Sequence, residues 1–301
     1  MKNTKHLMIA TLAAITLFPT VFYGADTGAA FLKIIPGARA QGMAGAATAL
    51  QGDVQFADVN PAGDAGASGI EAAFTHIELA QQNKLENIML AHDAFGGRFV
   101  YGVTYVHYGE LDGRDTLGNQ TGSFTAYDAA LRAGFAKSFG KLSLGGAVKG
   151  VRTSIADDSG TGFGFDAGAI YNFNLFRLGA AIVNVGKAGT VGTENADLPT
   201  TASFGVATMI KDVTIAADFR RNIPEDRTTL AGGAEMMLLK ILSVRAGYTR
   251  DTTNNSDIPS DNMNGLNAGF GLALNQFKID YAYTSQGELG NTHRFTVATK
   301  F

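Results

Sequence analysis

The sequence predicts an all-β protein, a transmembrane antiparallel β-barrel of about 14 strands with an N-terminal segment seated in the barrel mouth. Three observations predict this fold. From about Gly69 onward, apolar residues alternate with polar or small residues in successive runs. Many runs are 9 to 14 residues long, which suits tilted strands that cross a bilayer. Tight turns alternate with longer polar links between the runs.

The chain begins with an expected export signal. Two lysines near the start form a short basic region, and residues 7–23 form an almost uncharged apolar run. Small residues then precede Asp26, where the composition changes, so we expect cleavage there. A retained membrane anchor is the alternative interpretation. No later apolar stretch reaches the roughly 18 residues that a spanning helix needs. An exported chain of this kind is either a soluble periplasmic protein or a closed barrel.

The composition excludes several classes of protein. The chain has no cysteine, which removes disulfides, thiol catalysis, cysteine-based zinc sites and the acylated cysteine of a lipoprotein. The formal net charge is -3 without any basic block, so no electrostatic footprint for nucleic acid is present. Glycine numbers 38, which is unusual for a chain of 301 residues and requires a structural reason.

Fourteen predicted strands follow one another from residue 70 to the end. In one of them, Phe277, Ile279 and Tyr281 alternate with Lys278 and Asp280. Because side chains alternate across a strand, each run has one apolar face and one polar or small face. The expected ranges are 70–80, 86–94, 97–109, 123–138, 141–155, 161–173, 175–186, 200–210, 213–221, 226–239, 241–250, 263–275, 276–285 and 292–301.

The lengths of the connections are ordered. From the second strand onward, every other link is tight, as at 95–96, 139–140 and 211–212. The intervening links are usually longer and polar, as at 110–122, 187–199 and 251–262. Short turns at one rim and long loops at the other are typical of an outer-membrane barrel. The alternative, a soluble sandwich, would mix the two lengths.

The two faces of the strands indicate which side meets lipid. The apolar faces are too many for one shared core, whereas outside a barrel they meet hydrocarbon. The polar faces then point inward, where their glycines leave space and their charges are expected to pair across neighbouring strands. The inward charges are Asp128, Arg132, Asp166, Asp218, Arg220, Glu235, Arg245, Asp280 and Arg294.

The last strand carries a possible assembly signal. The chain ends at Phe301, and Val297 and Phe295 lie on the same face. A terminal aromatic residue on an amphipathic last strand resembles the signal read by barrel-assembly machinery. The alternative is a strand that happens to end with phenylalanine.

The segment before the first strand does not alternate. Residues 26–68 are rich in small residues, which let one backbone approach another closely. Pro61 favours an extended conformation at Asn60, whose side chain can then cap a turn. The sequence therefore predicts a compact, turn-rich segment inside the barrel mouth. A mobile export linker is the alternative.

Several of these residues resemble a known family. The run from Gly37 to Gly45, then Asp53, then residues 60–63 (Asn-Pro-Ala-Gly) is similar to the N-terminal signature of the PorV/PorQ family within the FadL-like barrels. Val59 and Asp64 depart from that pattern. The resemblance spans nearly all of the mature chain and implies a barrel plugged by a hatch. The implied hatch residues are Gly37, Arg39, Gly42, Met43, Gly45, Asn60, Pro61 and Ala62.

No pattern of residues indicates an enzyme. The sequence has no phosphate-binding loop before a helix and no Gly-x-Ser-x-Gly elbow. The histidines outside the export signal lie on separate predicted strands with no close spacing, so neither a metal site nor a catalytic triad is predicted. These histidines are His76, His92, His107 and His293. We expect no enzymatic activity, no cofactor and no metal.

The predicted organisation is a signal peptide at 1–25, a hatch at 26–68 and a transmembrane barrel at 69–301, located in the outer membrane of a diderm bacterium. Two functions remain open. The resemblance to PorV implies a barrel that receives secreted cargo for type IX-like secretion or surface attachment. The FadL-like relationship implies passive uptake of long-chain fatty acids or other hydrophobic small molecules. Expected partners are outer-membrane lipid, barrel-assembly machinery and either cargo with secretion-complex subunits or a hydrophobic solute, but not nucleic acid.

Overall fold

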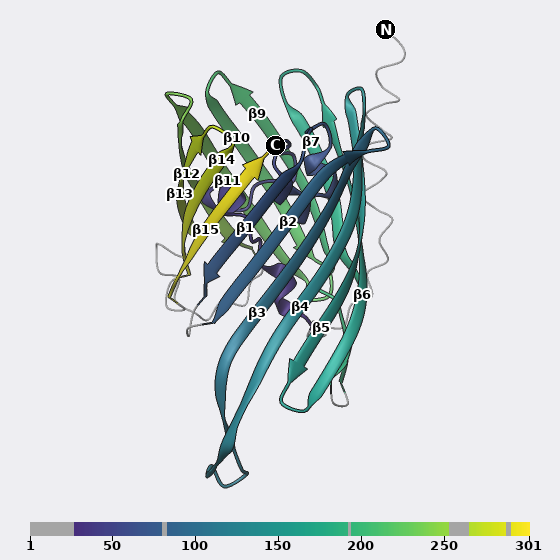
Figure 1. Cartoon of the computed structure of the whole chain (residues 1–301), viewed down its shortest axis with the longest axis vertical. Helices are drawn as coiled ribbons and strands as arrows, with labels where there is room; N and C mark the ends of the chain where they lie inside the picture. The colour runs from purple at the N-terminus through teal and green to yellow at the C-terminus, as the bar shows by residue number, and fades with distance from the viewer. Residues whose placement is uncertain (1–26, 80–82, 192–193, 253–264, 287–289) are drawn as a thin grey trace.

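An antiparallel sheet closed into a ring forms the body of this protein (Figure 1). A computed structural model describes residues 27–79, 83–191, 194–252, 265–286 and 290–301. The expected export signal lies outside the described residues, and so does nearly all of the long link expected at 251–262.

The described residues contain one sheet of 15 strands. Its strands are β1 (Glu71–Glu78), β2 (Lys84–Ala94), β3 (Gly97–Arg114), β4 (Gln120–Phe139), β5 (Leu142–Ile155), β6 (Asp158–Asn172), β7 (Arg177–Val191), β8 (Glu194–Asp197), β9 (Thr201–Ile210), β10 (Val213–Asn222), β11 (Arg227–Leu238), β12 (Leu242–Asp251), β13 (Leu266–Leu274), β14 (Phe277–Ser285) and β15 (Asn291–Lys300).

Two pairings close the ring. Strand β1 pairs with β15, and β6 pairs with β7, so that fourteen strands form a continuous barrel. The short strand β8 pairs only with β7, and β9 is the next strand of the ring after β7. The predicted 14-strand antiparallel barrel is confirmed, with β8 as an addition.

The connections divide between two rims. Tight turns join β2 to β3, β4 to β5, β6 to β7, β9 to β10, β11 to β12 and β13 to β14, and we call their end of the barrel the short-turn rim. At one of these turns Phe95 and Gly96 have φ values of 53° and 68°, the left-handed pair that a two-residue hairpin turn needs. The other end, which we call the long-loop rim, carries the remaining connections.

The hairpin of β3 and β4 is longer than the sequence predicted. The expected strands ended at residue 109 and began at 123, whereas the observed strands reach Arg114 and start at Gln120. This hairpin extends beyond the rest of the barrel (Figure 1). Its end is exposed on both faces, so the apolar alternation on which the prediction relied is absent there.

Large apolar side chains cover the outer surface of the ring. They are exposed at alternate positions, while their strand neighbours point inward. Examples from twelve of the fourteen ring strands are Phe74, Ile88, Tyr101, Leu131, Val148, Phe165, Phe204, Ile215, Leu230, Phe270, Ile279 and Phe295. A surface of this kind is stable in contact with hydrocarbon, and closure of the ring gives each strand two hydrogen-bonded neighbours, as a bilayer requires.

The N-terminal segment, residues 27–69, lies inside the ring (Figure 1). Its start contacts the long-loop rim, where Gly28 N donates to Asp197 O at 3.0 Å. Just after its end, Ile70 N donates to Phe301 O at 3.1 Å at the opposite rim, so the segment runs through the barrel from end to end. Its helical turns are η1 (Ala30–Lys33), α2 (Ala38–Gly42), η2 (Val54–Asp58) and η3 (Pro61–Asp64).

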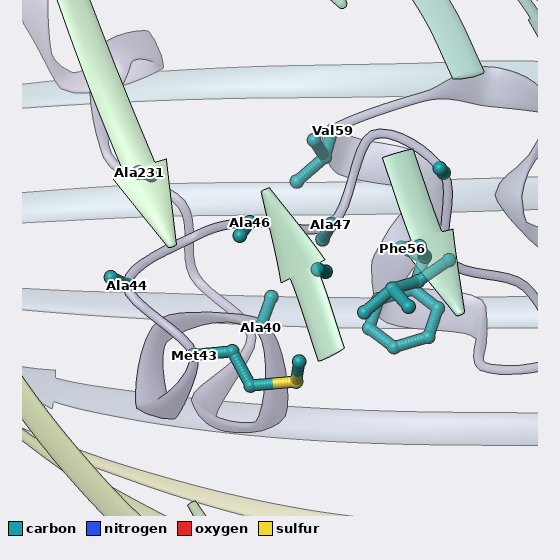
Figure 2. Close-up of a cluster of buried hydrophobic side chains, with 12 residues drawn as sticks. Ala40, Met43, Ala44, Ala46, Ala47, Phe56, Val59 and Ala231 are labelled. Atoms are coloured by element: carbon teal, nitrogen blue, oxygen red, sulfur yellow. The ribbon is translucent and has the colours of Figure 1, made fainter. Parts of the chain in front are cut away.

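Small side chains allow this segment to fit against the wall. Figure 2 shows Met43, Phe56 and Val59 among alanines of the segment, together with Ala231 of β11. The wall also contributes Ala207 of β9 and Ala216 of β10 to this buried cluster. Alanine loses little side-chain entropy on burial, so many alanines let two backbones approach closely at low cost. The core of the protein therefore lies between the segment and the wall.

The end of β15 places the expected assembly signal on the outer surface. Phe295 and Val297 are each 47% exposed and Phe301 is 70% exposed. Their recognition by assembly machinery stays a prediction. Among the residues that the structure describes, no helix has the length and hydropathy needed to cross a membrane.

We expect a charged side chain on the outward face of the wall to destabilise the folded barrel. Leu131 lies midway along β4 and is 63% exposed, so Leu131→Arg should destabilise the folded barrel in lipid vesicles by about 2–4 kcal/mol. Leu117 at the tip of the protruding hairpin is 85% exposed, and Leu117→Arg should change stability by less than about 0.5 kcal/mol. Urea unfolding followed by circular dichroism measures both. Equal stability of the two variants would contradict a lipid-facing wall.

Candidate functional site

Six charged side chains form a closed ring of ion pairs between the N-terminal segment and the wall. Arg245 joins Glu235 (2.6 Å) to Asp280 (2.7 Å) on the wall. Lys278 joins Asp280 (3.5 Å) to Asp53 (2.7 Å), which belongs to the segment. Arg39 of α2 completes the ring, because it bridges Asp53 and Glu235. We call this set the charge ring: Arg39, Asp53, Glu235, Arg245, Lys278 and Asp280.

Arg39 makes the most extensive contacts of the charge ring. Its Nε and Nη2 donate to the two oxygens of Glu235 at 2.9 and 2.7 Å, a bidentate geometry that favours arginine over lysine. Its Nη1 donates to Asp53 Oδ2 at 3.3 Å, and its guanidinium lies 5.1 Å from the centre of the Phe56 ring. One side chain thus fixes α2 relative to both the wall and η2.

Charge compensation offsets the cost of burying the Asp53 carboxylate inside the barrel. Burial raises the pKa of a carboxyl group, but Lys278 and Arg39 outweigh that effect at Asp53 and hold its pKa well below the usual range. Arg245 is buried, and two ion pairs shorter than 3 Å compensate the charge of its guanidinium group. In the charge ring each anion lies between two cations, so removing one member leaves buried charge without its partner.

A second cluster holds the end of the segment at the short-turn rim. Arg98 is 1% exposed, and its Nε donates to Asp64 Oδ2 at 2.9 Å. Its Nη1 donates to Asp93 Oδ1 at 2.9 Å and to Gly69 O. Gly69 N in turn donates to Asp93 Oδ2 at 2.7 Å. Asp64, one of the two departures from the family pattern, therefore has a defined partner on the wall.

A third cluster surrounds Asp166 midway along the lumen. Its carboxylate lies 3.0 Å from Lys149 Nζ and 3.4 Å from Arg132 Nε. Arg132 Nη2 also donates to Ala57 O of the segment at 2.8 Å. Lys149 Nζ donates to Asn184 Oδ1 at 2.5 Å. Wall charges at this level thus also hold the segment.

Three further inward charges bind neutral groups. Asp218 Oδ2 accepts hydrogen bonds from the Thr48 hydroxyl and from the backbone N–H groups of Ala47 and Thr48, at 2.6, 3.0 and 3.0 Å. Arg220 donates to the carbonyl oxygens of residues 44 and 45 at 3.3 and 3.4 Å. Asp128 accepts from the Tyr108 hydroxyl at 2.6 Å and from the Thr153 hydroxyl at 2.5 Å.

The Asn-Pro-Ala sequence forms a cap directly against the wall. Ala62 N donates to Asn60 Oδ1 at 3.0 Å, and Asn60 Nδ2 donates to Thr48 O at 2.7 Å. Pro61 opens η3 at a position where its missing N–H is not needed. A Cβ atom at Gly168 of β6 would overlap Asn60 Oδ1, so only glycine leaves room for the cap there.

The structure gives each predicted group of residues a definite position. Of the expected lumen charges, Glu235, Arg245 and Asp280 meet in the charge ring, and Arg132 pairs with Asp166. Asp128, Asp218, Arg220 and Arg294 have neutral partners instead. The predicted hatch residues all belong to the segment inside the ring, where Gly42 lies against Arg245, and Gly37 and Gly45 lie against Gln55 and Arg220.

The sequence analysis did not predict five ionic residues of these clusters: Lys149, Lys278, Asp64, Asp93 and Arg98. The alternation already placed Lys278 on a polar face, which was the signal available for it. Arg98 is the second residue of its strand, where alternation gives little information. Arg39 was expected in the hatch, but nothing local connects it with Glu235, 196 residues away.

A match to the model of a protein family assigns the chain to that family. Residues 9–163, just over half of the 301 residues, match the Uncharacterised protein family (UPF0164). The chain belongs to this family. No curated protein sequence matches it significantly.

Solved hydrocarbon channels share its fold. The deltaS2S3 mutant of the monoaromatic hydrocarbon channel TodX is 16% identical, with a TM-score of 0.61 over 88% of this chain and 99% of that one. The Pseudomonas putida toluene transporter TodX is 14% identical, with a TM-score of 0.59 over 86% and 95% of the two chains. The CymD monoaromatic hydrocarbon channel is 14% identical, with a TM-score of 0.59 over 88% of this chain and 97% of that one.

These likenesses show the fold. This member of UPF0164 has the closed antiparallel barrel fold of these channels. The finer resemblance to PorV/PorQ proteins stays a prediction.

Breaking the charge ring should lower the stability of the folded barrel more than removing an exposed arginine does. Arg245→Met leaves Glu235 and Asp280 short of a cation, so we expect a loss of about 3–5 kcal/mol. Arg152→Met is the matched control, because Arg152 is exposed and contacts only hydroxyl groups. Urea midpoints in lipid vesicles compare the two, and equal midpoints would show that the charge ring contributes nothing.

Proposed function

We propose that this protein is a channel through which hydrophobic small molecules enter across the outer membrane, without an enzymatic step. The observation that carries the proposal is a buried apolar cluster between the segment and the wall, below the long-loop rim. Phe31 of the segment meets Ile77, Leu85 and Leu198 there, and all four side chains are buried. Val106 of β3 and Val151 of β5 belong to the same cluster. An apolar solute arriving at this rim would gain the same burial.

A cavity of about 40 Å³ adjoins this cluster at Phe31 and Ala130, towards the middle of the lumen. Phe31, Leu32, Ile34 and Pro36 form its apolar side, and its polar side includes Asp58, Arg132 and Lys149. Two buried atoms here, Arg132 Nη1 and Asp58 Oδ2, have no hydrogen-bond partner among the described residues. The volume suffices for only a few water molecules, so a larger solute requires the segment to move.

The positions of the three ionic clusters favour transport of a hydrophobic solute over transport of a hydrophilic one. They join the segment to the wall from the middle of the lumen to the short-turn rim, so the segment stands across the path of a hydrophilic solute. Residues 29–36 have fewer polar ties to the wall. Two of these are the contact of Lys33 with Glu225 at 2.7 Å and that of the Leu32 carbonyl with Asn184 at 3.4 Å. We infer that this part of the segment moves when a solute passes.

The likeness to TodX, a toluene transporter, and to CymD, a monoaromatic hydrocarbon channel, supports the channel proposal over cargo reception. One feature favours the second function. The protruding hairpin of β3 and β4 offers exposed strand edges to a partner beyond the long-loop rim. If the barrel receives secreted cargo, deleting its gene changes the set of surface-attached proteins. An unchanged surface proteome would exclude that role.

Fixing residues 29–36 to the wall should stop uptake. The chain has no cysteine, so Lys33→Cys with Glu225→Cys can be joined by a cleavable bismaleimide that spans the former ion pair. Cells carrying the joined variant should take up labelled toluene or fatty acid at the rate of cells without the protein, and linker cleavage should restore uptake.

The matched control joins two wall residues at the same rim. Arg221 and Asp226 form an exposed ion pair across the β10–β11 connection, and joining cysteines there should leave uptake unchanged. Uptake that is equal with and without the protein would rule out the channel. Uptake that persists after joining residues 33 and 225 would rule out movement of this part of the segment.

A further inference from the structure

A groove of about 260 Å³ opens on the outer wall near the short-turn rim. It is lined by Phe135, Lys137 and Phe139 of β4 and by Leu144, Gly145 and Gly146 of β5. Gly146 is the cross-strand partner of Phe135, so the position that would carry an outward side chain is empty. A Cβ atom at Gly146 would approach only one backbone oxygen, at 3.6 Å. The groove is therefore a gap in the apolar surface.

A lysine lies within this apolar groove. Lys137 Nζ donates to the Phe95 carbonyl oxygen at 3.2 Å and lies 5.7 Å from the centre of the Phe139 ring. Across the part of the chain that the structure describes, no carboxylate forms an ion pair with it. An ammonium group has three donors, so the charge and at least one donor remain for a ligand.

The surroundings of the groove indicate the level of the membrane surface. The Phe99 ring lies tilted against Phe135, with ring centres 4.9 Å apart, and the Phe95 ring lies edge-on to Phe99 at 6.2 Å. Aromatic side chains collect where hydrocarbon meets headgroups. The same rim exposes further cations on its turns and strand ends, namely Lys141, Lys211, Lys240 and Lys300. This charge attracts anionic headgroups.

We propose that the groove binds one anionic glycerophospholipid. The phosphodiester accepts a charge-assisted hydrogen bond from Lys137, and an acyl chain lies along Gly146 between Phe135 and Leu144. The proposal requires that the barrel span a bilayer, but it does not depend on the transported solute. A phosphate held on the outer wall fixes the depth of the barrel in the leaflet at the short-turn side.

The test separates the headgroup contact from the acyl contact. Purified barrel in non-ionic detergent is mixed with phosphatidylglycerol, and retained lipid is counted by native mass spectrometry. Lys137→Gln should weaken retention at least tenfold, and Gly146→Leu should abolish it by filling the gap. Heat-modifiable migration on gels shows that each variant is folded.

Two control variants match these changes. Lys211→Gln removes a cation from the same rim, and Gly150→Leu adds leucine to an outward glycine of β5 with no atom within 4 Å of its Cβ position. Both should retain lipid like the unchanged protein. Equal losses in Lys137→Gln and Lys211→Gln would overturn the proposal in favour of a diffuse attraction to the rim.

Other occupants give different results. Retention of uncharged diacylglycerol at the level of phosphatidylglycerol would overturn the role of Lys137. Competition by millimolar inorganic phosphate with no preference for lipid would reduce the site to a free-phosphate site and overturn the acyl contact. A dimer that disappears in Gly146→Leu would show that a second copy, rather than a lipid, fills the groove.

Discussion

Hydrocarbon offers no hydrogen-bond partner, and this constraint governs the rest of the structure. The pairing of β6 with β7 closes the ring, and closure gives each strand of the ring two hydrogen-bonded neighbours. The large apolar side chains lie outside, as contact with lipid would require, and the small and charged ones lie inside. A ring of fourteen strands is too wide for its own side chains to fill, so the interior needs a further element. The N-terminal segment is that element.

The charge ring determines where the segment sits. Two of its members, Arg39 and Asp53, belong to the segment, and the other four project from β11, β12 and β14. Buried ion pairs contribute less to net stability than their Coulomb energy suggests, but they discriminate strongly against alternative positions. The alanine-rich contacts in Figure 2 bring the backbones close enough for these pairs to form. Fewer polar contacts hold residues 29–36, where the interior is apolar, so the movement proposed there would leave the charge ring intact.

Much of this fold could be predicted from the sequence, because period-2 alternation and turn order are local signals. They gave the strands, the closed barrel and the inward direction of Glu235, Arg245 and Asp280. Alternation specifies a face but not a partner, so it could not pair Arg39 with Glu235 or place Lys278 beside Asp53. The outer parts of β3 and β4 and the short β8 were missed, since strands beyond the bilayer carry no apolar face. The family resemblance predicted the position of Asn60 but not the partner of Asp64.

Mapping the environment of single positions along β4 tests the central claim most directly. Spin labels are attached to cysteines introduced one at a time at residues 129–133 of the barrel in lipid vesicles. Their relaxation is then measured with oxygen, which concentrates in lipid, and with a water-soluble nickel complex. The structure predicts high oxygen accessibility at 129, 131 and 133 and low accessibility to both reagents at 130 and 132. Oxygen accessibility without a two-residue period, or access of nickel to the outward positions, would contradict the lipid-facing barrel.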